Sequence, residues 1–211
     1  MIGVIDYEAG NTLSVIKALK YLGKTVELTN DRSKLLSCDH IVFPGVGAFY
    51  DAMEKLKSYD LISTIKTAVA NEIPFLGICL GMQLLFDTSE ETIGSPDKDA
   101  SSIEGLGILP GKIMRFNEME GFKIPQIGWN SASIVNKGSR LFKDIKNDSY
   151  FYFVHSYYLK ASDDSCVASR SEYCDIFDSA VEKNNIFGCQ FHPEKSGDQG
   201  LQILKNFCEL T

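Results

Sequence analysis

The segment around Cys79 constrains the fold of this 211-residue chain more than any other, because a glycine-flanked cysteine follows an apolar run there. The run covers residues 73–76, and Gly77-Ile78-Cys79-Leu80-Gly81 follows it directly. Glycines on both sides leave room for a sharp turn from a strand into a helix, with the thiol pointing into a cleft. The pattern therefore predicts a nucleophile elbow at Cys79, followed by a helix through Leu84, Leu85 and Phe86.

A second segment, Gln190-Phe191-His192-Pro193-Glu194, supplies the groups that a cysteine nucleophile needs. An imidazole can take the thiol proton, and a carboxylate can hold the imidazole in the right tautomer. If the segment is extended, His192 and Glu194 share one face. A glycine-flanked cysteine alone favours a structural role, but its combination with a preceding strand and a distant His-Pro-Glu favours catalysis. We expect a cysteine acyl-transfer enzyme that uses Cys79, His192 and Glu194.

The length and composition favour one globular domain over residues 1–211. Hydrophobic residues make up 44% of the chain and charged residues 23%, which excludes disorder as the main state. The net charge of -7 argues against a nucleic-acid backbone as the main partner, because such binding needs clustered Lys and Arg.

No targeting or membrane signal is recognisable in the sequence. The first residues lack a basic region, and no segment has the ~18 consecutive apolar residues of a membrane span. We expect a cytoplasmic protein. Six scattered cysteines without a secretory signal indicate free thiols. Because there is no CxxC pair and only three histidines are present, a metal site has little support, and we expect neither a metal nor a cofactor.

Short apolar strands alternate with helical periods in the first half of the chain. Helices are predicted at residues 12–22 and 61–70. This rhythm predicts a parallel sheet flanked by helices, whose ligands gather beyond the carboxyl ends of the strands, where Cys79 falls. The predicted strands of this half lie at residues 1–5, 25–28, 41–43 and 75–78.

The second half has a different pattern. Residues 88–105 are rich in Ser, Asp, Glu and Gly, which predicts an exposed loop. A final helix is predicted from Gly200. Between them we expect strands, some of them antiparallel, within residues 107–111, 123–130, 150–155 and 186–191.

Acyl transfer also needs hydrogen-bond donors for the developing oxyanion. The loop Pro44-Gly45-Val46-Gly47 follows a predicted strand, and its amides at Val46 and Gly47 could face the same cleft as the Leu80 amide. The alternative is a plain turn between a strand and a helix. A phosphate-binding loop is disfavoured because the Lys-Ser/Thr pair of a P-loop is absent. His155 follows an aromatic run and is expected to be a packed strand-end histidine rather than a catalytic base.

Five segments resemble the class I (triad) glutamine amidotransferases, and the similarity runs from Asp6 to the final helix. The resemblance implies the flavodoxin-like fold of that family, an α/β domain with a central, mostly parallel sheet, flanking helices and extra antiparallel strands. Within the family, the second, third and fourth segments are similar to the glutaminase subunit of imidazole glycerol phosphate synthase. The segments are ICLGMQLL (78–85), PGVGAF (44–49), GWN (128–130), YFVHSY (152–157) and FHPEKS (191–196).

The resemblance also implies a reaction. Cys79 would attack the side-chain amide of L-glutamine, His192 would protonate the departing ammonia, and water would release glutamate from the thioester. Glu194 would orient His192. The positions that match glutamine-binding residues of the family are Gly47, Gln83, Glu91, Ser156 and Tyr157.

A partner is implied as well. Ammonia would pass to a (β/α)8-barrel cyclase subunit, which forms imidazole glycerol phosphate and an aminoimidazole carboxamide ribotide in L-histidine biosynthesis. For Trp129, the one tryptophan, core packing is the alternative to an interface role. The positions that match the partner-facing surface are Asn11, Trp129, Asn130, Tyr150, Tyr152 and Lys195.

One departure from the family pattern is visible. The segment before Gly-Trp-Asn usually reads Pro-His-Met, and here it reads Pro125-Gln126-Ile127. This leaves open a paralogous amidotransferase that supplies ammonia for amidation of a surface sugar. Another triad amidotransferase, such as one feeding vitamin B6 synthesis, and a non-catalytic α/β binding module are the remaining alternatives.

Overall fold

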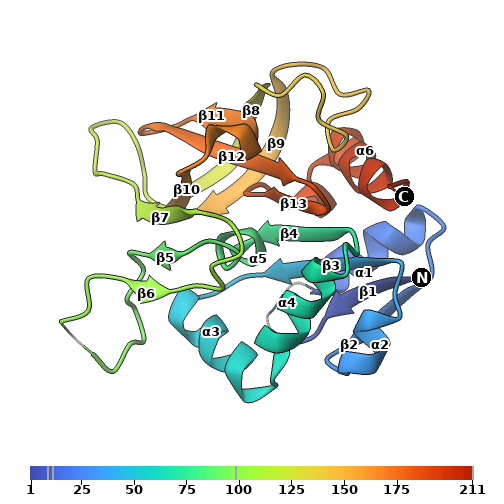
Figure 1. Cartoon of the computed structure of the whole chain (residues 1–211). Coiled ribbons are helices and arrows are strands. Elements are labelled where there is room, and N and C mark those ends of the chain that lie inside the picture. Colours follow the sequence, from blue (N-terminus) through green and yellow to red (C-terminus); the bar gives the residue numbers. More distant parts are fainter. Residues whose placement is uncertain (9, 11, 98, 211) are drawn as a thin grey trace.

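The protein is built on a sheet whose half with the N-terminal strands is parallel (Figure 1). A computed structural model describes residues 1–8, 10, 12–97 and 99–210 of the chain. The order of neighbours in this half is β2-β1-β3-β4-β13, and every adjacent pair is parallel. Strand β13 comes from the far end of the chain and joins the sheet beside β4. The strands are β1 (Ile2–Ile5), β2 (Val26–Thr29), β3 (His40–Gly45), β4 (Phe75–Cys79) and β13 (Ile186–Cys189).

Helices cover both faces of these strands (Figure 1). Successive residues of β1, such as Val4 and Ile5, enter two separate hydrophobic clusters because their side chains point to opposite faces of the sheet. One cluster contains residues of α1 (Thr12–Tyr21) and α6 (Gly197–Cys208). The other contains residues of α2 (Arg32–Leu36), α3 (Phe49–Ser58) and α4 (Leu61–Ala70). The expected α/β fold with helices on both faces is confirmed.

Strands that pair antiparallel, except for the parallel pair β7 and β5, extend the sheet beyond β13 in the order β12-β10-β7-β5-β6. Strands β11, β8 and β9 branch from β12 and form the upper layer in Figure 1. These strands are β5 (Thr88–Ser89), β6 (Ile103–Glu104), β7 (Gly111–Arg115), β8 (Gln126–Ile134), β9 (Ser149–His155), β10 (Tyr157–Ala161), β11 (Val167–Glu172) and β12 (Ile176–Lys183). Two short 3-10 helices, η1 (Asp164–Cys166) and η2 (Pro193–Lys195), complete the elements.

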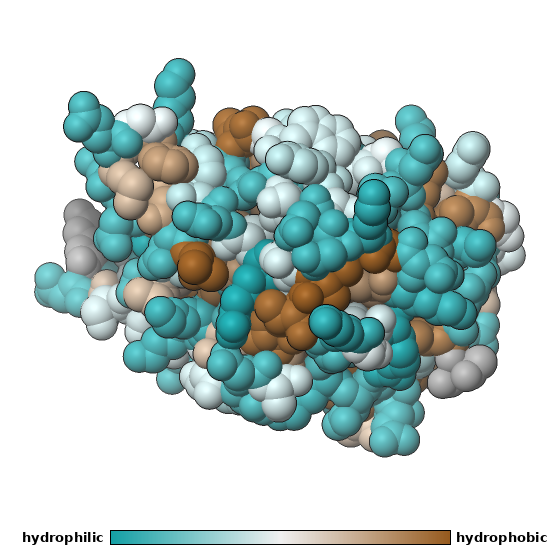
Figure 2. Space-filling model, turned by 90° about the horizontal axis from the view of Figure 1, so that it is seen from above, coloured by the Kyte–Doolittle hydropathy of each residue, from teal (hydrophilic) through white to brown (hydrophobic). Residues whose placement is uncertain are grey.

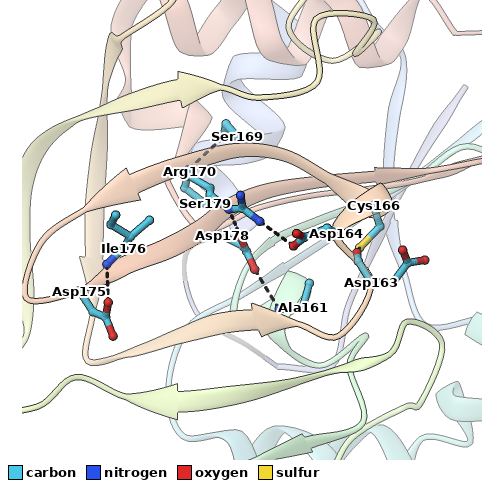
Figure 3. Close-up of polar contacts among 10 residues, drawn as sticks. All are labelled: Ala161, Asp163, Asp164, Cys166, Ser169, Arg170, Asp175, Ile176, Asp178 and Ser179. Carbon is cyan, nitrogen blue, oxygen red and sulfur yellow. Dashed lines mark hydrogen bonds and ion pairs between the residues drawn. The ribbon is translucent and has the colours of Figure 1, made fainter.

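Arg170 ties three of the antiparallel segments together (Figure 3). Its Nε donates to Asp178 of β12 at 2.9 Å, and one terminal nitrogen donates to Asp164 of η1 at 2.6 Å. The second carboxylate oxygen of Asp178 accepts from the Ala161 amide of β10 at 2.9 Å. The Asp178 carboxylate is 9% exposed, so both of its oxygens need partners, and this contact explains how β10, β11 and β12 keep their alignment.

Three local expectations differ from the structure. The helix after Cys79, α5 (Leu80–Gln83), is a single turn, because the carbonyls of residues 84–86 accept from amides of residues 106–109 instead of continuing the helix. The segment 88–105 is partly fixed rather than wholly an exposed loop, since β5 pairs with β7 and Ser89 is buried. The strand expected within 107–111 begins only at Gly111.

The face shown in Figure 2 is mostly hydrophilic, but hydrophobic residues form a band near its middle. Among the described residues, no helix is long and apolar enough to cross a membrane.

Close packing of α5 on the sheet predicts strong intolerance of a side chain at Gly81. An added Cβ would overlap the carbonyl oxygen of Phe43 in β3, and neither backbone can yield easily. We expect Gly81→Ala to lower the free energy of unfolding by about 3 kcal/mol in urea titrations. Gly138→Ala is the matched control, because its Cβ would meet only Asn136 Oδ1 at 3.4 Å. Equal stability of the two variants would contradict the packing described here.

Candidate active site

Cys79 is the last residue of β4 and the residue before α5, and it lies opposite Gly45 of β3. Its backbone angles are φ 53° and ψ -113°, in a region that non-glycine residues rarely adopt. The residue is 6% exposed. Because α5 starts immediately after it, the residue that carries the sulfur is followed by backbone amides that lack partners within the helix.

The glycines around Cys79 allow α5 to lie directly on the sheet. A Cβ at Gly77 would stand 2.7 Å from the backbone nitrogen of Met82, and one at Gly81 would overlap Phe43. The sequence pattern predicts that these glycines leave room for a sharp turn at the cysteine between them. In the structure Cys79 adopts the positive φ, while the glycines permit the close approach of helix to strands.

His192 and Glu194 lie next to this elbow. The His192 Nδ1 and Glu194 Oε1 atoms are 2.9 Å apart, and the two side chains are 3% and 0% exposed. Burial lowers the pKa of His192, but the charge of the Cys79 sulfur, a hydrogen bond to that sulfur and the Glu194 carboxylate outweigh burial and raise this pKa to about 10. The imidazole can therefore hold a proton beside the Cys79 sulfur at neutral pH.

Backbone contacts fix the position of His192. Its amide donates to the Tyr152 carbonyl of β9 at 2.9 Å. Ser196 Oγ donates to the His192 carbonyl at 2.6 Å and accepts from the Tyr152 amide at 3.0 Å. Strand β9 thus holds the histidine segment at the end of β13.

A pocket of about 340 Å³ opens at Cys79, within the usual range of roughly 300–1,000 Å³ for small-molecule sites. Every residue predicted to bind glutamine or the oxyanion lines it. Glu194 lies behind His192, outside the lining. The lining residues are Val46, Gly47, Cys79, Leu80, Gln83, Glu91, Ile93, Pro125, Val154, His155, Ser156, Tyr157, His192 and Lys195.

The loop at Val46 and Gly47 borders the pocket directly after β3. Gly47 has a φ of 107°, a region that favours glycine.

Tyr7 is packed beneath the loop and is 1% exposed. A Cβ added at Gly45 would clash with the Tyr7 hydroxyl. No described residue bonds that hydroxyl, and burial followed by the charge of Cys79 raises the Tyr7 pKa. Tyr7 is therefore a neutral filler below the loop.

Two polar side chains form the floor of the pocket. Gln83 Nε2 donates to the Tyr157 carbonyl at 2.9 Å and to Gln190 Oε1 at 2.8 Å. Glu91 accepts from the Phe49 amide at 3.1 Å, and burial raises its pKa. A bound ammonium group would stabilise the charged form of this carboxylate.

Gln190 also belongs to the site, although the sequence analysis did not predict it. Its side chain is 0% exposed, and its Nε2 lies 3.5 Å from Cys79 Sγ. Its position two residues before His192 on an extended segment was the available signal, because such residues share one face.

Gln126 is 3% exposed and contacts His155 Nε2 at 2.9 Å. The residue that departs from the family pattern is therefore buried rather than part of the surface. His155 is packed as expected, with Nδ1 2.9 Å from the Tyr157 carbonyl.

The β8–β9 hairpin carries an exposed aromatic and apolar face beside the pocket. Ile127 is 64% exposed, Trp129 56% and Tyr150 61%, so core packing of the tryptophan is wrong. Trp129 meets Tyr152 edge-on across the two strands, with ring centroids 6.1 Å apart. Lys195 Nζ lies 5.9 Å from the centre of the Tyr152 ring.

Asn130, a further residue of the expected partner surface, is tied to a neighbouring strand. Asn130 is half-buried, and its Nδ2 donates to the Glu172 carbonyl of β11 at 2.8 Å. Asn11 lies outside the described residues. Within the described ranges, no group of three or more His, Cys, Asp or Glu residues is arranged to hold a metal ion.

Comparison with known proteins gives consistent matches over the whole chain. The glutamine amidotransferase class-I family matches residues 3–210. The imidazole glycerol phosphate synthase subunit HisH of Methanocaldococcus jannaschii is 50% identical over 210 residues, which cover 100% of both chains. The HisH subunit of Moorella thermoacetica is 44% identical and is matched over 95% of its length, with 100% of this chain covered.

Solved structures share the fold at lower identity. A crystal structure described as a glutamine amidotransferase superposes with a TM-score of 0.71 at 17% identity, covering 98% of each chain. The glutaminase domain of Trypanosoma brucei CTPS gives a TM-score of 0.68 at 18% identity, with 100% of this chain and 94% of that chain covered.

The buried His155 predicts a specific loss of stability in acid. Burial lowers its pKa from 6.5 to about 4, so between these pH values the unfolded chain binds a proton that the folded chain does not. The free energy of unfolding therefore falls as pH drops from 6.5 to 4, by on the order of 2 kcal/mol from this residue. Urea titrations should show a shallower fall for His155→Gln. Parallel pH curves for the two proteins would contradict a neutral, buried His155.

Proposed function

The chain belongs to the class I glutamine amidotransferase family, and on this basis we propose that it is the glutaminase subunit of an imidazole glycerol phosphate synthase. It hydrolyses L-glutamine to glutamate and ammonia. The observation that carries the proposal is that Cys79 and His192 line one pocket while Glu194 contacts His192 from behind. We also propose that residues 1–211 form one glutamine amidotransferase type-1 domain and that it acts in the cytoplasm.

The geometry supports a thioester mechanism. Cys79 sulfur attacks the carboxamide carbon of glutamine, and the carbonyl electrons move to oxygen. Amides of Leu80 and of the Val46–Gly47 loop stabilise the oxyanion. His192 gives its proton to the leaving nitrogen, and ammonia departs as the carbonyl re-forms. Glu194 keeps the imidazole oriented.

Hydrolysis of the thioester regenerates the enzyme. His192, now neutral, takes a proton from water as the water oxygen attacks the acyl carbon. The second oxyanion uses the same amides, and its collapse expels the Cys79 thiolate with glutamate. The imidazolium and thiolate that began the cycle are thereby restored.

Glutamine would be held by groups at the pocket floor and rim. Glu91 would accept from the ammonium group of the substrate. Gln83, Gly47 and the backbone of Ser156 and Tyr157 would provide the remaining hydrogen bonds. These groups line the pocket beside Cys79, which agrees with a small polar substrate.

The partner that we propose is a (β/α)8-barrel cyclase subunit (HisF-like), in a heterodimer. Ammonia is largely protonated in neutral water and then is no nucleophile, so transfer through a dry interface preserves the reactive base. The exposed face of the β8–β9 hairpin borders the pocket and presents Trp129 and Tyr150, residue types that interfaces use as anchors. Asn11, Asn130, Tyr152 and Lys195 would contribute to the same contact. The cyclase would form imidazole glycerol phosphate and the carboxamide ribotide for L-histidine biosynthesis.

Removal of the Cys79 sulfur tests the assignment of the nucleophile. We expect Cys79→Ala to keep its affinity for the cyclase but to lose at least about a thousandfold in glutamate release, because no thioester can form. The matched control is Cys174→Ser, at a free, half-buried cysteine outside the pocket. The control should retain activity within about twofold. Continued glutamate release by Cys79→Ala would support a non-catalytic cysteine.

The isolated chain should be nearly inactive. Val46 is 39% exposed and Gly47 tolerates a wide range of φ, so the peptide between them can turn its amide toward or away from the oxyanion. Loss of one oxyanion donor lowers kcat by about 100-fold to 1,000-fold. We expect a stimulation of that order when the cyclase is added. Full glutamate release by the lone chain, with no gain on adding the partner, would refute this.

A further inference from the structure

A continuous row of buried polar groups leads from strand β8 to the Cys79 sulfur. Gln126 of β8 contacts His155 Nε2 at 2.9 Å, and His155 Nδ1 contacts the Tyr157 carbonyl at 2.9 Å. Gln83 Nε2 donates to that carbonyl at 2.9 Å and to Gln190 Oε1 at 2.8 Å. Gln190 Nε2 then lies 3.5 Å from Cys79 Sγ. We call these groups the amide row.

The members of the amide row have almost no access to water. Gln126 is 3% exposed, His155 6%, Gln83 4% and Gln190 0%. Transfer of an amide from water to a buried site is unfavourable when the amide has no hydrogen bond, so each member depends on its neighbours for compensation. Loss of one member should therefore disturb the hydrogen bonds and the orientation of the other members.

The chemistry of His155 fixes the direction of the hydrogen bonds at the β8 end. The Tyr157 carbonyl can only accept, so Nδ1 carries the proton in a neutral ring and Nε2 is an acceptor. The Gln126 atom placed 2.9 Å from this nitrogen is Oε1, which is also an acceptor. We therefore assign the side-chain amide the reversed orientation, in which its nitrogen donates to His155 Nε2. A leucine at position 126 could not donate, whereas a histidine could do so from a ring nitrogen.

Gln83 is oriented by the middle of the row. Both hydrogens of its amide nitrogen are used, one by the Tyr157 carbonyl and one by Gln190. Its Oε1 has no donor among the described residues, and Gln83 lines the pocket. The row thus leaves Gln83 with an acceptor for a ligand and keeps the Tyr157 backbone in place.

Gln190 forms the other end of the row. Since its Oε1 accepts from Gln83, its Nε2 is the group that faces the sulfur. An N–H group beside sulfur stabilises the thiolate relative to the thiol. The order of the row therefore determines which amide atom meets the nucleophile.

We propose that Gln126, His155 and Gln190 are positioning residues, which hold Gln83 and the Tyr157 carbonyl against glutamine and direct one N–H to the Cys79 sulfur. This inference rests on the proposed function of the pocket. It gives Gln126, the residue that differs from the usual family pattern, a role at the glutamine site. Because Gln126 and the exposed Ile127 are neighbours in β8, the row begins directly behind the face proposed for the partner.

Substitutions at Gln126 test the donor role, with the chain in its complex with the cyclase subunit. We expect Gln126→Leu to raise KM for glutamine about tenfold, with a smaller change in kcat, because His155 and Tyr157 lose their orientation. Gln126→His should restore KM to within about twofold of the parent. Gln199→Leu, at an exposed glutamine of α6, is the matched control and should leave KM unchanged. Equal KM values for the parent and Gln126→Leu, or equal defects in the Leu and His variants, would overturn the proposal.

Alkylation of Cys79 by iodoacetamide at neutral pH provides a readout that needs no glutamine. We expect Gln190→Leu to slow it about tenfold, since the thiolate loses a donor. The effects of Gln126→Leu and Gln190→Leu on kcat/KM should not multiply in the double variant, because both disturb the same row. Multiplicative effects together with unchanged alkylation would overturn the proposal. If the parent complex releases no glutamate, the proposed function fails, and the alkylation rates still decide whether the row acts on Cys79.

Discussion

The close packing of a single helical turn, α5, on strands β3 and β4 is the constraint on which the site depends. Gly77 and Gly81 permit this contact, and a Cβ at either position would meet backbone of the neighbouring element. The turn from β4 into α5 places Cys79 at a φ of 53°, so the strain falls on the residue that carries the sulfur. Because α5 lies so close to the strands, one edge of the sheet contains the nucleophile, the start of α5 and the end of β3.

The second half of the chain completes the site through the sheet rather than through local sequence. Strand β13 pairs in parallel with β4, with Cys189 opposite Ile78, so the residues after β13 emerge beside the elbow. Strand β9 then fixes His192 through Tyr152 and Ser196. The same strand forms a hairpin with β8, whose outer face is exposed and aromatic. One pair of strands therefore supports both the base and the surface proposed for the partner.

The local parts of this arrangement were predictable from the sequence. Apolar runs and helical periods predicted the parallel strands and α4, and the glycine-flanked cysteine predicted the elbow. The short length of α5 was not predictable, because Leu84, Leu85 and Phe86 continue the helical pattern while their carbonyls bond a distant segment. The buried role of Gln126 also escaped prediction, because it depends on pairings between residues far apart in the chain. Gln190 was not predicted, although its position two residues before His192 placed it on the same face. The direction of the Gln126 amide follows only when the contacts of His155 are known.

The proposed reaction requires that the elbow present Cys79 sulfur to the carboxamide carbon of glutamine. Covalent labelling of the complex can test this, with a glutamine analogue that carries a chloroketone in place of the carboxamide, followed by peptide mass spectrometry. We expect one label per chain, on Cys79, that free glutamine prevents and that parallels the loss of glutamate release. A label on another cysteine, or full loss of activity with Cys79 unmodified, would contradict this role of the elbow.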